Sequence, residues 1–137
     1  MKPFNIRVYG LLIHENRILV IREPFAGQLI DKFPGGGLEY GEGLTDCLKR
    51  EFLEELNLEI EVENHFYTQD FFLKSRFDDS EQIIMIYYRV KPKNISEFRV
   101  LDPEIQEIIW KELDLLSADD LTLPTDKLVV EMLLGLK

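Results

Sequence analysis

The stretch "REFLEELNL", residues 50–58, decides how the whole chain is interpreted. Its three acids, Glu51, Glu54 and Glu55, are spaced i, i+3 and i+4, so they are neighbours along one side of a helix. Like charges at these spacings weaken a helix by about 0.2–0.5 kcal/mol per pair. Their repulsion would be relieved by a cation that the surrounding sequence supplies or binds.

The pattern around this stretch predicts a helix over residues 43–56. At about 100° per residue, a single arc holds the apolar positions that we expect to face the core: Leu44, Leu48, Phe52 and Leu56. The three acids border this arc instead of lying opposite it. A solvated acidic face and a metal site both remain open, because Mg²⁺ prefers carboxylate oxygens and carboxylates at a half-buried margin need compensation.

A glycine-rich segment, "FPGGGLEYGEG", directly precedes the helix. Its consecutive glycines, Gly35, Gly36 and Gly37, would let the backbone approach a ligand closely. A flexible hairpin turn is the alternative interpretation. The glycines and the acidic helix together carry more information than either does alone.

Loop and helix combined resemble the Nudix box: a glycine, five residues, a glutamate, seven residues, then Arg-Glu-aliphatic-x-Glu-Glu-x-Gly-aliphatic. Here the box starts at Gly36, continues through Glu42 and ends with residues 50–58. Phe52 replaces the usual aliphatic residue, and Asn57 replaces the box glycine. Asn is the best non-glycine residue in a left-handed helix cap, so we expect Asn57 to preserve the backbone geometry.

Weaker resemblance to the MutT-like branch of the family extends over the rest of the chain. It includes the FPGG run, Trp110 on a late strand and "LSADDL" before the final helix. The resemblance implies one Nudix hydrolase domain over residues 1–137, with an α/β fold: an α/β/α sandwich around a mixed sheet.

The resemblance also implies Mg²⁺- or Mn²⁺-dependent hydrolysis of a nucleoside diphosphate linked to another group. Water would attack phosphorus at a carboxylate-bound metal cluster. The chain carries a net charge of −10, which makes a bare polyphosphate an awkward ligand. Divalent cations between the two sets of anions would resolve that conflict.

The box match assigns roles to individual residues. The metal ligands would be Glu51, Glu54, Glu55 and the carbonyl of Gly35, with catalysis involving Glu51, Glu54 and Arg50. Arg50 is expected to pair with Glu51 or Glu42 and hold those carboxylates in place. For the general base the resemblance favours a loop shortly before the Trp strand, where Glu104 is the preferred candidate. Glu107 and Glu81 are the alternatives. A solvated loop carboxylate is the alternative for Glu104, and Glu51 itself could deprotonate the attacking water.

Substrate contacts are expected from Arg22, Gly36, Gly37 and Phe33. Arg22 at the end of the second strand could contact phosphate or could be a surface charge. Aromatic side chains could stack on a base or pack in the core: Tyr9, Phe33, Phe77 and Trp110. Cys47 is expected to be a small packing residue.

The remaining pattern predicts the order ββ–α–ββ–β–α. Residues 5–14 and 17–23 form a predicted hairpin, and residues 24–37 are predicted to be a loop. Strands are predicted over residues 59–72, 81–90 and 104–113, and an amphipathic helix over 123–136. Such intermixed elements favour a mixed sheet with helices on its faces.

Composition excludes several other classes of protein. One cysteine excludes a disulfide or a Cys-based zinc site within the chain, and the two histidines, His14 and His65, are interpreted as loop and strand surface. The acidic net charge disfavours binding to a nucleic-acid polymer. No apolar run could cross a bilayer, and "MKPFNIRVYG" resembles no signal peptide, so a cytoplasmic monomer or homodimer is expected.

The substrate does not follow from the sequence. The proline that marks the ADP-ribose branch is absent at its usual distance, since Pro92 is the first proline after the box. Spacing places Thr125 where the MutT-like branch reads an oxidised purine through an asparagine. A catalytically silent nucleotide-binding or regulatory module is the alternative function, and a Nudix-fold isomerase would need a catalytic cysteine in a loop, whereas Cys47 is predicted to be helical.

Overall fold

The computed structural model describes residues 3–76 and 78–135. Its strands are β1 (Phe4–His14), β2 (Arg17–Phe25), β3 (Gln28–Lys32), β4 (Gly35–Gly37), β5 (Ile60–Thr68), β6 (Gln82–Pro92) and β7 (Glu107–Glu112). Its two α-helices are α1 (Leu44–Leu56) and α2 (Pro124–Leu133). Short 3₁₀ turns, η1 (Ile95–Glu97), η2 (Leu113–Leu115) and η3 (Ala118–Asp120), lie in the connections.

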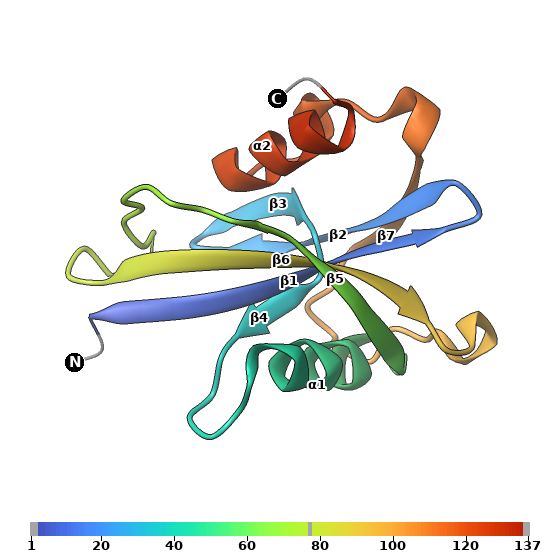
Figure 1. Ribbon diagram of the computed structural model, residues 1–137, viewed down its shortest axis with the longest axis horizontal. Coiled ribbons are helices and arrows are strands. Elements are labelled where there is room, and N and C mark those ends of the chain that lie inside the picture. The colour runs from blue at the N-terminus through green and yellow to red at the C-terminus, as the bar shows by residue number, and fades with distance from the viewer. Residues whose placement is uncertain (1–2, 77, 136–137) are drawn as a thin grey trace.

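The seven strands form a mixed sheet in which β3, β2, β1, β6 and β5 follow one another. β4 pairs with β1, and β7 pairs with β2. The pairing of β1 with β6 is parallel, and the other strand pairings are antiparallel. Helix α1 covers one side of the sheet and α2 the other (Figure 1). The structure therefore confirms the expected α/β/α sandwich with a mixed sheet.

The core has two parts, one on each side of the sheet. Under α1, alternate residues of β1 and β2 such as Val8 and Leu19 pack against the helix residues Leu48 and Phe52. Under α2, the intervening residues, Tyr9 among them, pack with Val129 and Val130. The period-2 alternation of a strand thus divides one apolar run between two layers.

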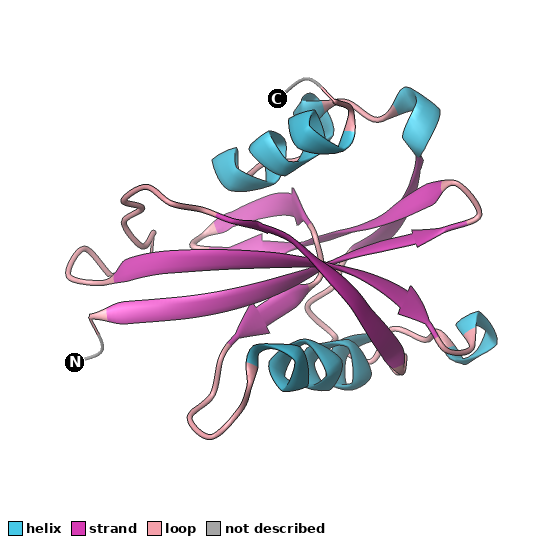
Figure 2. Ribbon diagram, viewed as in Figure 1, coloured by secondary structure: helices cyan, strands magenta, loops and turns pink. Residues whose placement is uncertain are grey.

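The prediction of a loop over residues 24–37 is wrong. β2 continues to Phe25, the turn residues Ala26 and Gly27 adopt positive φ (48° and 82°), and β3 returns along β2. The glycines then form the short strand β4 against β1 (Figure 2). The glycines and prolines of this segment were interpreted as signs of a loop. In the structure Gly27 belongs to a tight hairpin turn, and Gly35–Gly37 form a strand.

Other boundaries differ by a few residues. The strand predicted over 59–72 ends at Thr68, β6 continues to Pro92, and the strand predicted over 104–113 covers only Glu107–Glu112. The final helix occupies Pro124–Leu133, within the predicted range. Phe77, a predicted stacking residue, lies outside the described residues. Within the described ranges, no helix has the length and apolarity needed to span a bilayer.

Candidate active site

Helix α1 holds the box acids at the edge of the sheet core. Its buried side chains include the predicted Leu48, Phe52 and Leu56, while Leu44 is partly buried. Beside them, the side chain of Glu51 is 15% exposed and that of Glu54 is 61% exposed. Glu51 thus lies at the core margin, as predicted, and Glu54 faces solvent more than the helical projection suggested.

The helix ends at Asn57 in the left-handed conformation that the sequence predicted. Its φ and ψ are 53° and 33°, and its backbone N–H donates to the Leu53 carbonyl. The side-chain amide donates to the Glu97 carbonyl at 2.9 Å, which joins the helix end to η1. Replacing the box glycine therefore leaves the cap geometry in place.

Strand β4 brings the glycines directly under Glu51. A β-carbon at Gly36 would lie 2.5 Å from the carboxyl carbon of Glu51, closer than real side chains approach. A β-carbon at Gly35 would lie 2.1 Å from the Val8 carbonyl oxygen, and Gly35 has a φ of 150°. These two positions need glycine because a side chain would displace either the box carboxylate or strand β1.

Arg50 organises the acids on the solvent side of the site. Its guanidinium pairs with Glu42 at 2.6 Å, Glu51 at 3.0 Å and Glu54 at 3.3 Å, and it donates to the Gly37 carbonyl at 3.1 Å. The hydrogen bond from Arg50 lowers the pKa of Glu42 to about 2. The predicted pairing with Glu51 or Glu42 is confirmed, since Arg50 contacts both.

Glu55 is the box acid that Arg50 does not reach. One oxygen of its carboxyl group, Oε1, is buried and has no hydrogen-bond partner. Burial raises the pKa of Glu55 to about 8; the nearby Lys32 opposes this shift, while Glu51, Glu23 and Asp102 reinforce it. Lys32 pairs with Glu23, and among the described residues no cation lies within ion-pair distance of Glu55.

These residues fit a divalent cation. Within residues 3–76 and 78–135, no three acidic, His or Cys side chains converge as a preformed metal cluster, and Arg50 is the cation that bridges Glu51 and Glu54. Yet the unpartnered oxygen of Glu55 lies on the same helix face as Glu51, and oxygen donors are the ligands that Mg²⁺ and Mn²⁺ prefer. A bound cation would satisfy the Glu55 oxygen that the protein leaves without a partner.

The loop before β7 supplies a further acid that sequence reasoning missed. The backbone N–H groups of Leu101 and Asp102 donate to the Glu55 carbonyl, at 2.8 and 3.3 Å. Asp102 also acts electrostatically on the Glu55 carboxyl group. Glu104, the preferred base candidate, is exposed on the same loop, where its N–H donates to Asp102. Asp102 is thus the acid of this loop that acts on Glu55, and the sequence had not singled it out.

The other candidate bases have partners of their own. Glu107 lies on β7 and pairs with Arg22 at 3.1 Å. Glu81 accepts a hydrogen bond from Asn5 at 3.2 Å. Arg22, the predicted phosphate contact, also pairs with Asp31 at 2.7 Å, so its charge is already matched by two carboxylates.

The aromatic candidates divide between the core and a cavity wall. Phe33 does not agree with its predicted role in substrate contact, because it is 0% exposed and packs edge-on against Tyr87. Trp110 packs against Phe98 in the layer under α1. Cys47 is buried, as predicted, and burial raises the pKa of its thiol to about 11. Tyr9, although buried, lines a cavity on the α2 side of the sheet, and Trp110 lines another.

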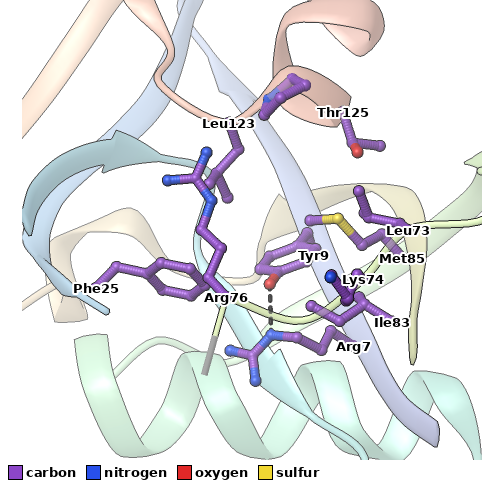
Figure 3. Close-up of a pocket in the computed structure, with 11 residues that line it drawn as sticks. Arg7, Tyr9, Phe25, Leu73, Lys74, Arg76, Ile83, Met85, Leu123 and Thr125 are labelled. Atoms are coloured by element: carbon purple, nitrogen blue, oxygen red, sulfur yellow. Dashed lines mark hydrogen bonds between the residues drawn. The ribbon is translucent and has the colours of Figure 1, made fainter. Parts of the chain in front are cut away.

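The cavity beside Tyr9 lies on the α2 side of the sheet, and the space between its walls, open solvent included, is about 370 Å³. Its walls are largely apolar: Phe25, Leu73, Ile83, Met85, Leu123 and Pro124. Three cationic side chains, Arg7, Lys74 and Arg76, also line it, together with Thr125 (Figure 3). The apolar walls suit an aromatic ring, and the cations around them suit negative charge on a group attached to that ring.

Lys32 and Glu23 lie between Tyr9, which lines the cavity, and Glu55 of the box, on which both act electrostatically. Lys32 is buried under the Tyr9 ring, 5.1 Å from its centroid, and pairs with Glu23 at 3.1 Å. Sequence reasoning missed both residues because it placed Lys32 in a loop. The signal was the spacing of Ile30 and Lys32, which are two residues apart and lie on the same buried face of β3.

Known proteins resemble this chain in sequence and in fold. The family model described as NUDIX domain matches residues 3–132. A protein named Nucleoside triphosphatase NudI, from Enterobacter sp. (strain 638), is 33% identical over 91 residues, or 64% of each chain. An 8-oxo-dGTP diphosphatase from Buchnera aphidicola subsp. Schizaphis graminum (strain Sg) is 40% identical over 62 residues, 44% of this chain and 47% of that protein. The matches thus span less than two thirds of either relative.

Solved structures share the fold at lower sequence identity. The solution structure of the E. coli ORF135 protein has a TM-score of 0.79 and 20% identity, and the match covers 98% of this chain and 91% of that one. A MutT NUDIX hydrolase from Burkholderia pseudomallei has a TM-score of 0.73 and 21% identity, with coverage of 93% and 96%. These likenesses establish the architecture around the site.

Proposed function

This chain belongs to the Nudix family, and we propose that it is a metal-dependent nucleotide pyrophosphohydrolase. The observation that carries the proposal is the unpartnered, buried oxygen of Glu55 beside Glu51 on a glycine-cradled helix. Such a carboxyl group is costly in the folded protein unless a cation binds it. A family whose box carboxylates bind divalent cations provides the reason for keeping it.

Glu51, Glu54 and Glu55 would hold the cation, with the carbonyl of Gly35 as a further oxygen donor. A bound Mg²⁺ or Mn²⁺ would supply charge neutralisation for the phosphate oxygens and acidify water. Arg50 already restrains Glu51 and Glu54 through ion pairs. Arg50 would thus hold the carboxylate oxygens of Glu51 and Glu54 in position to bind the metal.

The loop that follows Leu101 would provide the general base. Asp102 lies close enough to Glu55 to influence its ionisation, and Glu104 is exposed two residues further on. Either carboxylate could accept the proton that the attacking water loses. The reaction breaks one phosphorus–oxygen bond of the anhydride and forms another to the water oxygen, so two phosphorylated products result.

The cavity on the α2 side would receive the nucleobase. Its apolar walls suit an aromatic ring, and its cations suit the attached phosphates. Related proteins are named as a nucleoside triphosphatase and an 8-oxo-dGTP diphosphatase. A nucleoside triphosphate is therefore the first substrate class to assay.

The proposal is tested by a substrate panel with Mg²⁺ and detection of the phosphorylated products. The panel contains the common NTPs and dNTPs, 8-oxo-dGTP, ADP-ribose, NDP-sugars and dinucleoside polyphosphates. We expect Mg²⁺-dependent turnover of at least one member and loss of turnover in EDTA. Binding of nucleotides without turnover of any member would contradict hydrolysis and favour the regulatory module.

A further inference from the structure

We propose that Arg7 binds a phosphate group of the substrate and spans the gap between the base cavity and the box. This inference rests on the proposed function and adds a substrate-binding residue that the sequence did not single out. Arg7 lies on β1, half-buried, and lines the cavity beside Tyr9.

One nitrogen of Arg7 is used within the protein. Its Nε donates to the Tyr9 hydroxyl at 2.6 Å, drawn as the dashed line in Figure 3. This bond fixes the orientation of the planar guanidinium and leaves the two terminal nitrogens pointing away from Tyr9. A guanidinium held in this way is preorganised for a bidentate contact with an anion.

The terminal nitrogens lie beside the box. Nη1 of Arg7 is 3.6 Å from the position that a β-carbon at Gly37 would occupy, and Arg7 lies opposite Gly37 in the pairing of β1 with β4. Glu51 of the box and Glu23 of β2 both act electrostatically on Arg7. Arg7 is thus a member of the cavity wall that also lies next to the carboxylates of α1.

Arg7 differs from the arginines whose charge is already matched. Arg22 and Arg50 each form ion pairs with two or more carboxylates, whereas in the described part of the chain Arg7 forms none. The protein has 26 acidic and 16 basic residues, so carboxylates are plentiful. Arg7 lies between an apolar cavity and the box helix with no described carboxylate within ion-pair distance, so its terminal nitrogens are available for a ligand's negative charge.

The position explains how one substrate could occupy both halves of the site. The described residues that line the cavity do not include a box carboxylate. A nucleotide with its base in the cavity and its anhydride at α1 must cross the region that Arg7 fills. We therefore assign to Arg7 the phosphate nearest the nucleoside.

Equilibrium binding with Mg²⁺ present tests this role, because the probes replace the α–β anhydride oxygen by a methylene group that cannot be hydrolysed. The probes are the α,β-methylene analogues of ATP, GTP, CTP and UTP, with the four matching nucleosides as phosphate-free references. Arg7→Met removes the charge at similar length, Arg7→Lys keeps the charge without the fork, and Arg17→Met is the matched control. Arg17 is exposed at the β1–β2 hairpin, with one distant ion pair to Glu112 at 3.9 Å. Thermal unfolding of each variant checks folding.

We expect Arg7→Met to weaken binding of the analogues about 10- to 100-fold, the range for a lost charge-assisted contact. Arg7→Lys should fall between Arg7→Met and wild type, while Arg17→Met stays within about twofold. Nucleoside affinity should be the same in all four proteins.

If Arg7→Met loses the same factor of affinity for analogue and nucleoside, Arg7 has only a structural role and the inference is overturned. Wild-type affinity of Arg7→Met for the analogues would also overturn it. If the protein hydrolyses no panel member but its binding of the analogues depends on Arg7, the phosphate-binding role of Arg7 is supported and the proposed hydrolysis is contradicted. If wild type hydrolyses nucleotides and Arg7→Met does so with the same KM, the role of Arg7 is contradicted while the proposed hydrolysis stands. A wild type that binds no analogue overturns it as well.

Discussion

At the scale of single residues, Asn57 shows how a departure from the box pattern is accommodated. A left-handed conformation costs an ordinary L-residue about 1–2 kcal/mol, and Asn tolerates it better than most. The sequence predicted this cap correctly because the preference is local. It could not predict the hydrogen bond to the Glu97 carbonyl, since that partner is brought in by the fold.

Asn57→Ala should lower the free energy of unfolding by about 1–2 kcal/mol, because alanine meets the positive φ without the side-chain bond. Asn57→Gly should cost less, because glycine adopts this φ freely and loses only the bond to Glu97. Urea unfolding of the three proteins measures both changes. Equal destabilisation by alanine and glycine would mean that the hydrogen bond, and not the backbone conformation, matters at this position.

At the scale of elements, the site depends on the contact between β4 and α1. Gly36 lies so close to Glu51 that the strand can only be built from a residue without a side chain at this point. The box spacing of Gly36 and Glu51 is thus a packing requirement as well as a chemical signature.

Gly36→Ala should lower turnover by at least about tenfold with only a modest loss of stability, because the added carbon displaces the Glu51 carboxylate at the core margin. Turnover and urea unfolding measured together separate the two effects. Gly37→Ala is the steric control for folding, since the nearest heavy atom to its added carbon would lie 3.6 Å away. Wild-type turnover in Gly36→Ala would contradict the importance of this contact.

Local patterns predicted the elements better than their ends. The apolar arc of α1 and the alternation of β1 and β2 are periodic, so they were recognised from the sequence alone. β3 was missed because its five residues are flanked by turn-forming glycines, and its pairing with β2 is a tertiary feature. Strand β5 ends early because the buried side chain of Gln69 accepts a hydrogen bond from the Met85 N–H.

At the scale of the whole molecule, a buried polar layer joins α2 to the sheet. Asp126 in the first turn of α2 is completely buried and accepts a hydrogen bond from the Tyr87 hydroxyl on β6. Lys32 on β3 acts on Asp126 from the same interior. Burial raises the pKa of Asp126 to about 6, while Tyr87 and Lys32 oppose that shift.

This shift has a definite sign for stability. Between the unfolded pKa of 3.8 and the folded pKa of about 6, the folded protein binds more protons at Asp126 than the unfolded chain. Stability contributed by this group is therefore present below pH 4 and is lost as pH rises towards 6.

The difference in unfolding free energy between wild type and Asp126→Asn should thus fall by about 2–3 kcal/mol from pH 4 to pH 7. Urea unfolding in EDTA at intervals of half a pH unit measures it. Asp119→Asn, the same substitution at an exposed position, is the control. A difference that rises with pH would show that the fold favours the ionised carboxylate.

The site was predictable where its residues are close in the sequence. The helix acids, Arg50 and the glycines belong to one segment, so their spacing carries the information. Arg7, Glu23 and Asp102 come from three other elements. The pairing of β1 with β4, the contact of Glu23 with Lys32 and the packing of the loop on α1 bring them near the box. Phe33 was assigned to the substrate because the sequence cannot distinguish a buried ring from one that lines a cavity.

The central claim is that the α1 carboxylates bind a divalent cation, and Glu55 is its most direct test. Glu55→Gln keeps the shape of the side chain and removes its charge, and Glu59→Gln, at an exposed position paired with Lys93, is the control.

The decisive measurement is a titration of the three proteins with Mn²⁺, followed by electron paramagnetic resonance of the free ion. We expect wild type and Glu59→Gln to bind Mn²⁺ equally and Glu55→Gln to bind at least about tenfold more weakly. The same Glu55→Gln protein should lose at least about 100-fold in turnover while keeping its fold. Mn²⁺ binding by Glu55→Gln at wild-type strength would contradict the account.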